Sequence, residues 1–162
     1  MEYTIRKAQR EDLPRIEEIY AYARRFMAET GNPNQWGNTN PAEETLREDI
    51  AVGQLYVVER DSNICGVFAF ILGEDETYKV IYDGSWRSNA PYGTIHRIAS
   101  LREAKGVFTE AFEYCRGVIR HLRIDTHHDN KVMQHVVTKH GFERCGIIHL
   151  PDGAPRIAYE IE

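Results

Sequence analysis

The chain has 162 residues, of which 42% are hydrophobic and 28% are charged, and its formal net charge is −5. This length and composition are typical of one globular domain, so we expect residues 1–162 to fold as a single domain. The sequence has no run of about 18 apolar residues and no signal-like N-terminus, and its basic residues are scattered, which argues against a membrane protein and against a nucleic-acid partner.

The N-terminal third is predicted to form a short strand followed by two helices. Residues 3–6 form the strand, and Asp12 as N-cap with Pro14 in the first turn begins a helix that ends near Gly31. A polar loop follows. The second helix is expected to run to about Gly53, and its start is marked by an N-cap, an N1 proline and a capping-box acid at Asn40, Pro41 and Glu43.

The middle of the chain is rich in β-forming residues. Residues 55–59 and 65–72 are separated by Asp61, Ser62 and Asn63, which is typical of a hairpin of two antiparallel strands. Residues 73–91 are polar and aromatic without a clear period. We therefore expect a long connection there, one that can fold over a site.

The C-terminal half alternates strands and helices before a closing hairpin. Strands are expected at residues 94–99 and 121–126, and the helix between them has its inward stripe at Val107, Ala111, Phe112 and Cys115. A helical crossover of this kind makes the two strands parallel. A fourth helix ends at Gly141, and residues 145–150 and 157–161 close the chain as a hairpin.

These elements together predict an α/β (α+β) fold. Their order is β, α, α, β, β, β, α, β, α, β, β. It indicates a mixed sheet that is mostly antiparallel, contains one parallel pair and is covered by helices on both faces.

Two segments next to the parallel pair carry residues suited to ligand binding. At Lys105 and Gly106 a turn opens a helix, whose unpaired N–H groups and partial positive charge suit a pyrophosphate. A glycine that only starts a helix is the simpler alternative. The second segment, from Asp125 to Asn130, lies at the C-terminal edge of a parallel strand, where open α/β sheets place ligands. Capping of the fourth helix by Asn130 or Asp129 is its structural alternative.

These segments in this order resemble the GNAT superfamily of acetyl-CoA-dependent N-acetyltransferases, and the resemblance extends over nearly the whole chain. In that family the fourth strand, a phosphate loop of the pattern Q/R-x-x-G-x-G/A, a helix, the fifth strand and an Asn with a later Gly-Phe pair recur together. Here Asn130 is followed at the family's spacing by Gly141 and Phe142. The resemblance implies a seven-stranded sheet whose parallel pair is splayed to admit CoA.

The phosphate loop departs from the family pattern, because Gly106 matches the first glycine while Glu103 stands at the Q/R position and Phe108 at the second glycine. The main-chain N–H groups of residues 105–109 are still expected to cradle the pyrophosphate, with Lys105 adding positive charge. The resemblance implies that backbone groups of the fourth strand pair with the pantetheine. The expected contacts to the cofactor are Ile98, Ala99, Ser100, Lys105, Gly106, Val107, Phe108, Thr109, Asn130 and Met133.

For the reaction, the resemblance implies acetyl transfer to a primary amine of a small molecule or peptide, by direct attack on the thioester of acetyl-CoA in a ternary complex. Because an alkyl amine is mostly protonated at neutral pH, the site needs a base. Asp125 is the first candidate, since some family members carry an acid at this position, and His96 in the fourth strand is the second. Their structural alternatives are a salt bridge from Asp125 to Arg123 or Arg97, and a hydrogen-bonded strand histidine.

Many members carry a tyrosine on the fourth helix as the acid for the departing thiolate, and Val137 occupies that position here. Tyr82, Tyr92 and His127 are candidate substitutes. Departure of the thiolate without help is the alternative, because a thiol of this kind is acidic enough.

Gln35 and Trp36 lie between the first two predicted helices, in the region that shapes the acceptor pocket of this fold. Together with Tyr82 they are expected to contact the acceptor, although Trp36 as a hydrophobic lid without a role in specificity is an equal alternative. We expect no metal, because the most closely spaced histidines match no zinc pattern: His121, His127 and His128.

The three cysteines, Cys65, Cys115 and Cys145, are far apart in apolar surroundings. An odd number of separated cysteines is typical of reduced, buried thiols, so we expect a cytoplasmic protein. Only the arginines that neighbour Cys115 and Cys145 favour a reactive thiol, and we expect none.

Two other functions compete with acetyl transfer. A non-catalytic acyl-CoA-binding or sensing module is favoured by the departures at Glu103, Phe108 and Val137. A dinucleotide-dependent oxidoreductase would need a glycine fingerprint after an early strand, which the sequence lacks. As partners we expect an amine acceptor and either a monomer or a homodimer.

Overall fold

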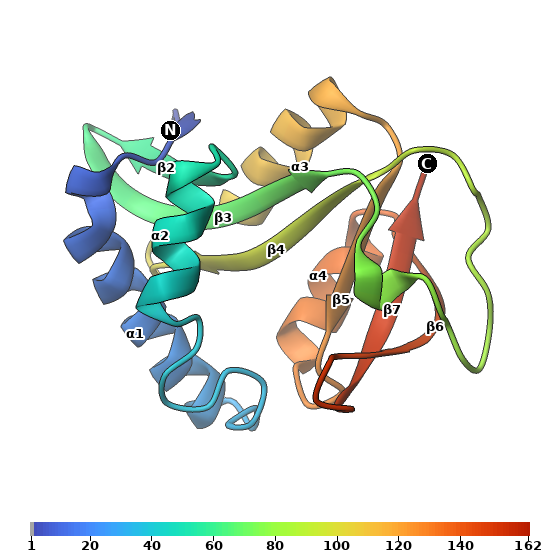
Figure 1. Cartoon of the computed structure of the whole chain (residues 1–162). Helices are drawn as coiled ribbons and strands as arrows, with labels where there is room; N and C mark the ends of the chain where they lie inside the picture. The colour runs from blue at the N-terminus through green and yellow to red at the C-terminus, as the bar shows by residue number, and fades with distance from the viewer. Residues whose placement is uncertain (1) are drawn as a thin grey trace.

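The computed structural model describes residues 2–162, and its elements follow the predicted order (Figure 1). The strands are β1 Thr4–Lys7, β2 Leu55–Arg60, β3 Asn63–Leu72, β4 Gly93–Ser100, β5 Leu122–Thr126, β6 Glu143–His149 and β7 Pro155–Ile161. The α-helices are α1 Leu13–Glu29, α2 Glu43–Ala51, α3 Val107–Val118 and α4 Lys131–Lys139, and two short 3-10 turns are η1 Arg10–Asp12 and η2 Glu76–Tyr78. Among the described residues, no helix combines the length and apolar character needed to cross a bilayer.

The seven strands form one sheet in the order β1-β2-β3-β4-β5-β7-β6. Every pairing is antiparallel except that of β4 with β5, which confirms the predicted parallel pair. These two strands pair only at Gly93 with Leu122 and at Thr94 with Arg123. Beyond Thr94 they diverge, so the sheet opens into two arms, as the V between β4 and β5 shows (Figure 1). The predicted splay is therefore present.

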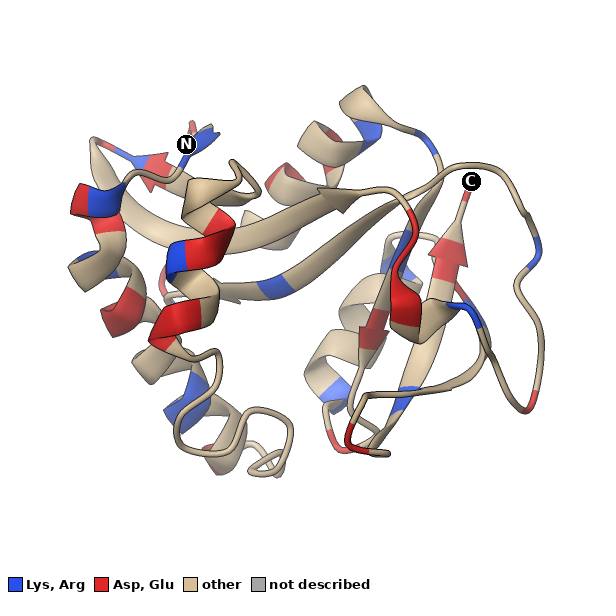
Figure 2. Cartoon of the chain, in the orientation of Figure 1, with Lys and Arg blue, Asp and Glu red and all other residues tan. Residues whose placement is uncertain are grey.

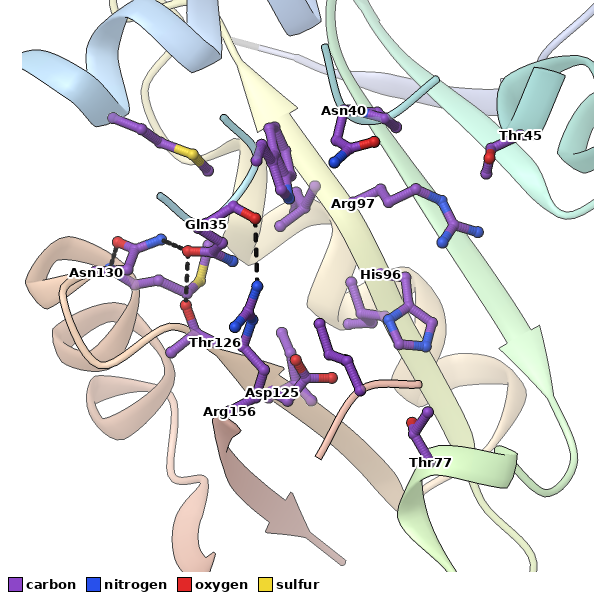
Figure 3. A pocket seen from close by; sticks show the side chains of 18 of the residues that line it. Gln35, Asn40, Thr45, Thr77, His96, Arg97, Asp125, Thr126, Asn130 and Arg156 are labelled. Atoms are coloured by element: carbon purple, nitrogen blue, oxygen red, sulfur yellow. Dashed lines mark hydrogen bonds between the residues drawn. The ribbon is translucent and has the colours of Figure 1, made fainter. Parts of the chain in front are cut away.

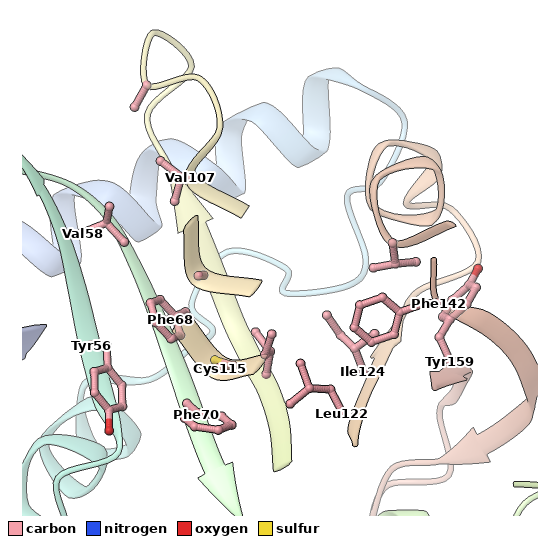
Figure 4. Packing of buried hydrophobic residues seen from close by; sticks show 14 of the residues in the cluster. Tyr56, Val58, Phe68, Phe70, Val107, Cys115, Leu122, Ile124, Phe142 and Tyr159 are labelled. Atoms are coloured by element: carbon pink, nitrogen blue, oxygen red, sulfur yellow. The ribbon is translucent and has the colours of Figure 1, made fainter. Parts of the chain in front are cut away.

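Helices cover both faces of the sheet, because the strands alternate apolar side chains between two cores. On β3, Val67 and Ala69 belong to the core under α1 and α2, whereas Phe68 and Phe70 belong to the core under α3 and α4. Figure 4 shows the second core, where Val107 and Cys115 of α3 face the sheet. At Gly66 of β3 a Cβ atom would lie 2.7 Å from a methyl of Val107, so glycine lets α3 approach the sheet closely.

The structure confirms one predicted N-cap position and corrects the other. Asp12 is the N-cap residue of α1, as predicted, although its carboxylate makes no capping hydrogen bond and instead binds Arg6 and the backbone N–H of Gln9. The second helix begins at Glu43, later than predicted, with Ala42 rather than Asn40 at the N-cap. The backbone carbonyl of Asn40 accepts a hydrogen bond from Arg24 of α1, so this residue joins the loop to the first helix.

The sequence predicted a long connection between β3 and β4 that can fold over a site, and in the structure this connection folds back over the sheet. Trp86 donates its indole N–H to the carbonyl of Tyr78, and Tyr82 forms an isolated antiparallel bridge with Ile147 of β6. The connection therefore covers the arm built by β5, β7 and β6 (Figure 1), and it brings Asp75 and Thr77 to the cavity at the opening between the arms.

The three cysteines are free and buried, as predicted. Burial raises the pKa of the Cys115 thiol to about 12. Burial also raises the pKa of Cys145 to about 11, although Arg87 lies 2.9 Å from its sulfur. Neither thiol is therefore a ready nucleophile at neutral pH.

Candidate active site

A bulge in β4 turns this strand away from β5 and so creates the opening. Val67 pairs with Ala99 and Ala69 with His96, which leaves one extra residue on β4 between these pairs. Arg97 has a φ of 52°, in the left-handed region that side chains other than glycine rarely adopt. Two contacts hold it there: Tyr20 of α1 donates a hydrogen bond to its carbonyl, and its guanidinium binds both oxygens of Asp49 at 3.0 Å.

Two cavities meet at this opening. The larger, of about 550 Å³, lies between the end of β4, the loop before α3, and α4. The smaller, of about 390 Å³, lies between β4, β5 and the loop that follows α1. Both are lined by Met27, Ile98, Asn130 and Met133, so a ligand in one can reach the other at the point where the strands part.

The larger cavity collects all ten residues predicted to contact the cofactor: Ile98, Ala99, Ser100, Lys105, Gly106, Val107, Phe108, Thr109, Asn130 and Met133. Gly106 occupies the N-cap of α3 with a φ of 82°, so the first turn of the helix opens toward this space. Phe108 packs its ring against Phe112 and His140 on the cavity wall. Basic side chains line the same cavity: Arg102, Lys105 and Lys139.

The smaller cavity brings together four of the residues predicted for catalysis and acceptor binding, namely Asp125, His96, Gln35 and Trp36 (Figure 3). Tyr82 is not among them. It is half exposed, and its ring packs edge-on against His149 at the far arm of the sheet. The expectation that Tyr82 contacts the acceptor is therefore not supported by its position, because the bridge to Ile147 holds it away from the opening.

His96 forms a hydrogen bond of 2.8 Å through Nε2 with Oδ2 of Asp75, a residue that the sequence did not single out. Burial raises the pKa of Asp75, but the hydrogen bonds from His96 and Thr77 outweigh that effect and lower the pKa to about 2. The carboxylate is therefore ionised at neutral pH and can only accept, so Nε2 of His96 carries the proton. Its Nδ1 has no hydrogen-bond partner among the described residues and is the nitrogen available to a ligand.

Asp125 lies across the cavity from His96 and accepts a 2.6 Å hydrogen bond from the hydroxyl of Tyr78. Tyr78 is fully buried, and burial raises its pKa far above the usual range, so the hydroxyl stays a donor. The alternative role of Asp125, a salt bridge to Arg123 or Arg97, is wrong. Arg97 pairs with Asp49 and Arg123 pairs with Glu160, so neither arginine is its partner.

Asn130 caps α4, with its side-chain oxygen accepting from the N–H of Met133 at 2.9 Å. Its amide nitrogen donates to Oε1 of Gln35, which also accepts from Asn32 and Thr126. Capping is therefore confirmed for Asn130, and the same side chain joins the loop after α1 to the C-terminal end of β5. Figure 3 shows this junction between the two arms.

The three predicted substitutes for the missing tyrosine acid lie outside both cavities. Val137 itself is fully buried in the core. The hydroxyl of Tyr92 accepts from the backbone N–H of Asp75, and the imidazole of His127 accepts from the N–H of Asp129. Burial, reinforced by nearby cationic groups, lowers the pKa of His127.

One group among the described residues has the spacing of a metal site. Ligand atoms of His127, His128 and Asp129 lie within 4.8 Å of one another. His121, which the sequence placed near them, binds Glu160 and Ala90 instead. His127 already uses Nδ1 for a backbone hydrogen bond, so only its Nε2 is open to an ion.

Comparison with known proteins defines the class of protein. No family model matches the chain, and no curated protein matches it in sequence. Among solved structures, a GNAT family acetyltransferase from Streptococcus agalactiae 2603 has a TM-score of 0.88 and 31% identity, over 98% of this chain and 94% of that one. The PaiA N-acetyltransferase from Thermoplasma acidophilum, in complex with coenzyme A, has a TM-score of 0.69 and 16% identity, over 100% and 99%.

A GNAT family acetyltransferase from Listeria monocytogenes 4b F2365 gives a TM-score of 0.73 and 15% identity, over 99% and 94% of the two chains. The two more distant structures show the same fold. The streptococcal structure, at 31% identity over almost its full length, shows the family. This chain belongs to the GNAT acetyltransferase family.

Proposed function

We propose that the protein is an acetyl-CoA-dependent N-acetyltransferase that acetylates a primary amine within one domain. The observation that carries this proposal is the meeting of the two cavities where β4 leaves β5, with His96 and Asp125 facing each other just beyond that point. A thioester reaching the junction from the larger cavity would lie beside an amine held in the smaller one.

The larger cavity suits the cofactor. Beyond the bulge, Ala99 pairs with Val67 of β3, whereas no strand among residues 2–162 pairs with the β5-facing side of β4, so backbone groups of residues 98–100 remain for the pantetheine. The N–H groups of the first turn of α3 and the nearby side chains of Lys105 and Lys139 would neutralise the pyrophosphate. Coenzyme A bound to the related Thermoplasma protein supports this assignment.

The contacts favour His96 as the base. The ionised Asp75 fixes the tautomer, leaving the lone pair on Nδ1 to accept a proton from the amine directly or through water. Asp125 already accepts a hydrogen bond from Tyr78 on one of its two carboxylate oxygens. Its negative charge would instead hold the ammonium form of the acceptor before deprotonation.

The proposed chemistry is a single displacement. The ammonium form of the acceptor first loses one proton to water. The neutral amine nitrogen then forms a bond to the acetyl carbon, the C–S bond breaks, and the second proton passes from the nitrogen to Nδ1 of His96. The sulfur leaves as a thiolate without a tyrosine acid, which is reasonable because thiols of this kind have a pKa of about 8.5. Backbone N–H groups at the bulge would stabilise the transient oxyanion.

Turnover and binding are tested together. Acetyl-CoA should raise the melting temperature, and a panel of primary amines should release free thiol. His96→Gln should lower kcat by about 10² to 10⁴ fold, the usual value of a general base. The matched control is His149→Gln, since His149 is exposed and lies outside both cavities.

The outcomes separate the two candidate functions. Binding of acetyl-CoA without turnover on any amine would support the non-catalytic acyl-CoA module that Glu103, Phe108 and Val137 favour. Absence of binding by coenzyme A and acetyl-CoA at millimolar concentration would overturn both. Turnover that survives His96→Gln but is lost in Asp125→Asn would transfer the role of base to Asp125.

A further inference from the structure

The buried charges of the described residues are paired, with one exception. Asp49 binds Arg97, and Glu160 binds both Arg123 and His121. Arg156 of β7 is only 7% exposed, yet no carboxylate lies within 4.0 Å of its guanidinium among residues 2–162. A buried cation without a counter-ion is costly, so such a residue calls for an explanation.

The protein satisfies only part of this guanidinium. Nη1 donates to the carbonyl of Pro155 at 2.9 Å and Nη2 to the carbonyl of Gln35 at 3.2 Å. A guanidinium has five N–H donors, so donors remain, and the side chain lines the smaller cavity. Burial lowers the pKa of Arg156, although nearby acidic groups, Asp125 first, oppose that effect. The group nevertheless stays charged, because an arginine loses its proton only far above neutral pH.

Arg156 and Asp125 stand on adjacent strands of the same cavity wall. β5 and β7 pair with Asp125 opposite Ala158 and Thr126 opposite Ile157, which places Arg156 one step further along. Figure 3 shows both side chains directed into the cavity, with His96 on the opposite wall. The wall thus offers an anion and a cation side by side that do not bind each other.

We propose that the acceptor is a free amino acid, whose carboxylate binds Arg156 while its amine lies between Asp125 and His96. The proposal rests on the acetyltransferase function and names its substrate class. A carboxylate matches the fork of a guanidinium and would supply the missing counter-ion. An amino group a few bonds away would then meet the acidic side of the wall, and a cavity of about 390 Å³ suits a ligand of this size.

A purely structural role for Arg156 makes a different prediction. Its two carbonyl contacts tie the loop at Gln35 to β7, and if that were its whole purpose, the enzyme would not distinguish acceptors by their carboxylate. A ratio between two substrates isolates the difference, since loss of folded protein lowers both rates equally.

The test compares each proteinogenic L-amino acid with its own amide, using thiol release with acetyl-CoA. The amide keeps the side chain and the amine but removes the negative charge, and its less basic amine is the more reactive one near neutral pH. We expect at least one amino acid to exceed its amide in kcat/KM by about 100-fold or more, because the amide leaves a buried cation unpaired.

Arg156→Gln should lower the ratio of kcat/KM for the amino acid to kcat/KM for its amide to about one, chiefly through a higher KM for the amino acid. Arg156→Lys should retain part of this preference. Arg10→Gln is the matched control, because Arg10 is exposed and lies outside the cavities. Circular dichroism and melting curves check that each variant folds. If a variant does not fold, the preference of the unmodified protein for amino acids over their amides still tests the proposal.

If the enzyme acetylates amides or carboxylate-free amines as efficiently as every amino acid, the proposed substrate class is overturned, and the acetyltransferase function is left intact. A preference that persists unchanged in Arg156→Gln would overturn the role of this residue. If no amine releases thiol although acetyl-CoA binds, the underlying function fails first, and the proposal fails with it.

Discussion

Two histidines, one in β4 and one directly before β5, each form a short hydrogen bond with a carboxylate, and the two pairs differ in what surrounds them. His96 and Asp75 are joined at 2.8 Å, and His121 and Glu160 at 2.7 Å. The side chains of the first pair are 20% and 21% exposed and line a cavity, whereas both side chains of the second pair are 3% exposed.

The buried pair of His121 and Glu160, which we call the sealed pair, has all its main hydrogen-bonding groups occupied by protein partners; His96 and Asp75 form the open pair. The second ring nitrogen of His121 contacts the carbonyl of Ala90, and Glu160 also accepts from Arg123 and from the backbone N–H of Arg87. These bonds fasten the connection between β3 and β4 to β5 and β7. In the open pair, Nδ1 of His96 is left without a protein partner among the described residues. Equal chemistry therefore has unequal consequences: the saturated pair stabilises the fold, and the unsaturated pair is available for proton transfer.

The largest expected effect concerns the stability of the sealed pair. Glu160→Ala leaves Arg123 and His121 buried without a counter-ion, so it should lower the free energy of unfolding by about 3–5 kcal/mol. Denaturant unfolding measures this loss, and kcat/KM per folded molecule should stay within a factor of two or so of the unmodified protein. A loss of activity without a loss of stability would reverse the roles that we assign to the two pairs.

The corresponding change at the open pair is Asp75→Asn, with a smaller effect on stability and a clear effect on the pH profile. Because the folded pKa of Asp75 is about 2, its interactions stabilise the protein above the unfolded value of 3.8 and are lost as pH falls through about 4 to 2. Because both side chains of the pair are about one-fifth exposed, solvent screens this interaction, and we expect a contribution of about 1 kcal/mol. In Asp75→Asn this part of the acid dependence should disappear.

Activity gives the second measurement for the same variant. Asp75→Asn removes the carboxylate that holds Nε2–H of His96 and directs Nδ1 into the cavity, so kcat/KM should fall about 10-fold. Thr77→Val serves as the control, because it removes one donor to the carboxylate but keeps the charge. An unchanged kcat/KM in Asp75→Asn would contradict the positioning of a catalytic His96 by this carboxylate.

The sequence predicted the scaffold of the site better than its polar contacts. The order of elements and the parallel pair follow from local periodicity and turn residues, and the family motif located the residues around the larger cavity, including Gly106 and Asn130. Such features depend on neighbours in sequence or on a conserved family pattern. They are the part of a fold that local patterns can specify.

The partners of the catalytic candidates could not be predicted in this way. Asp75 lies 21 residues from His96, and Tyr78 lies 47 residues from Asp125, both in a connection without periodicity. Arg156 stood one residue before the strand predicted at 157–161, in no motif, and the structure places it in β7. The missing capping hydrogen bond of Asp12 has the same cause, since Arg6 of β1 competes for its carboxylate only once the sheet has formed.

The smallest expected effect concerns Cys145, which contacts Glu160 of the sealed pair. Cys145 is 5% exposed, lies 2.9 Å from Arg87 and 3.7 Å from Glu160, and its pKa is raised to about 11 by burial first and by Glu160 second. Cys145→Ala should cost only about 1 kcal/mol, because Glu160 keeps its stronger donors when the sulfur is removed.

Denaturant unfolding of Cys145→Ala beside Cys115→Ala makes the comparison. Cys115 is fully buried in the apolar core under α3 and has no charged partner, so its loss measures packing alone. A cost at Cys145 as large as that of Glu160→Ala would mean that the thiol, and not the carboxylate, is the centre of the sealed cluster. Similar small costs at both cysteines would assign the stability of this cluster to its ion pairs.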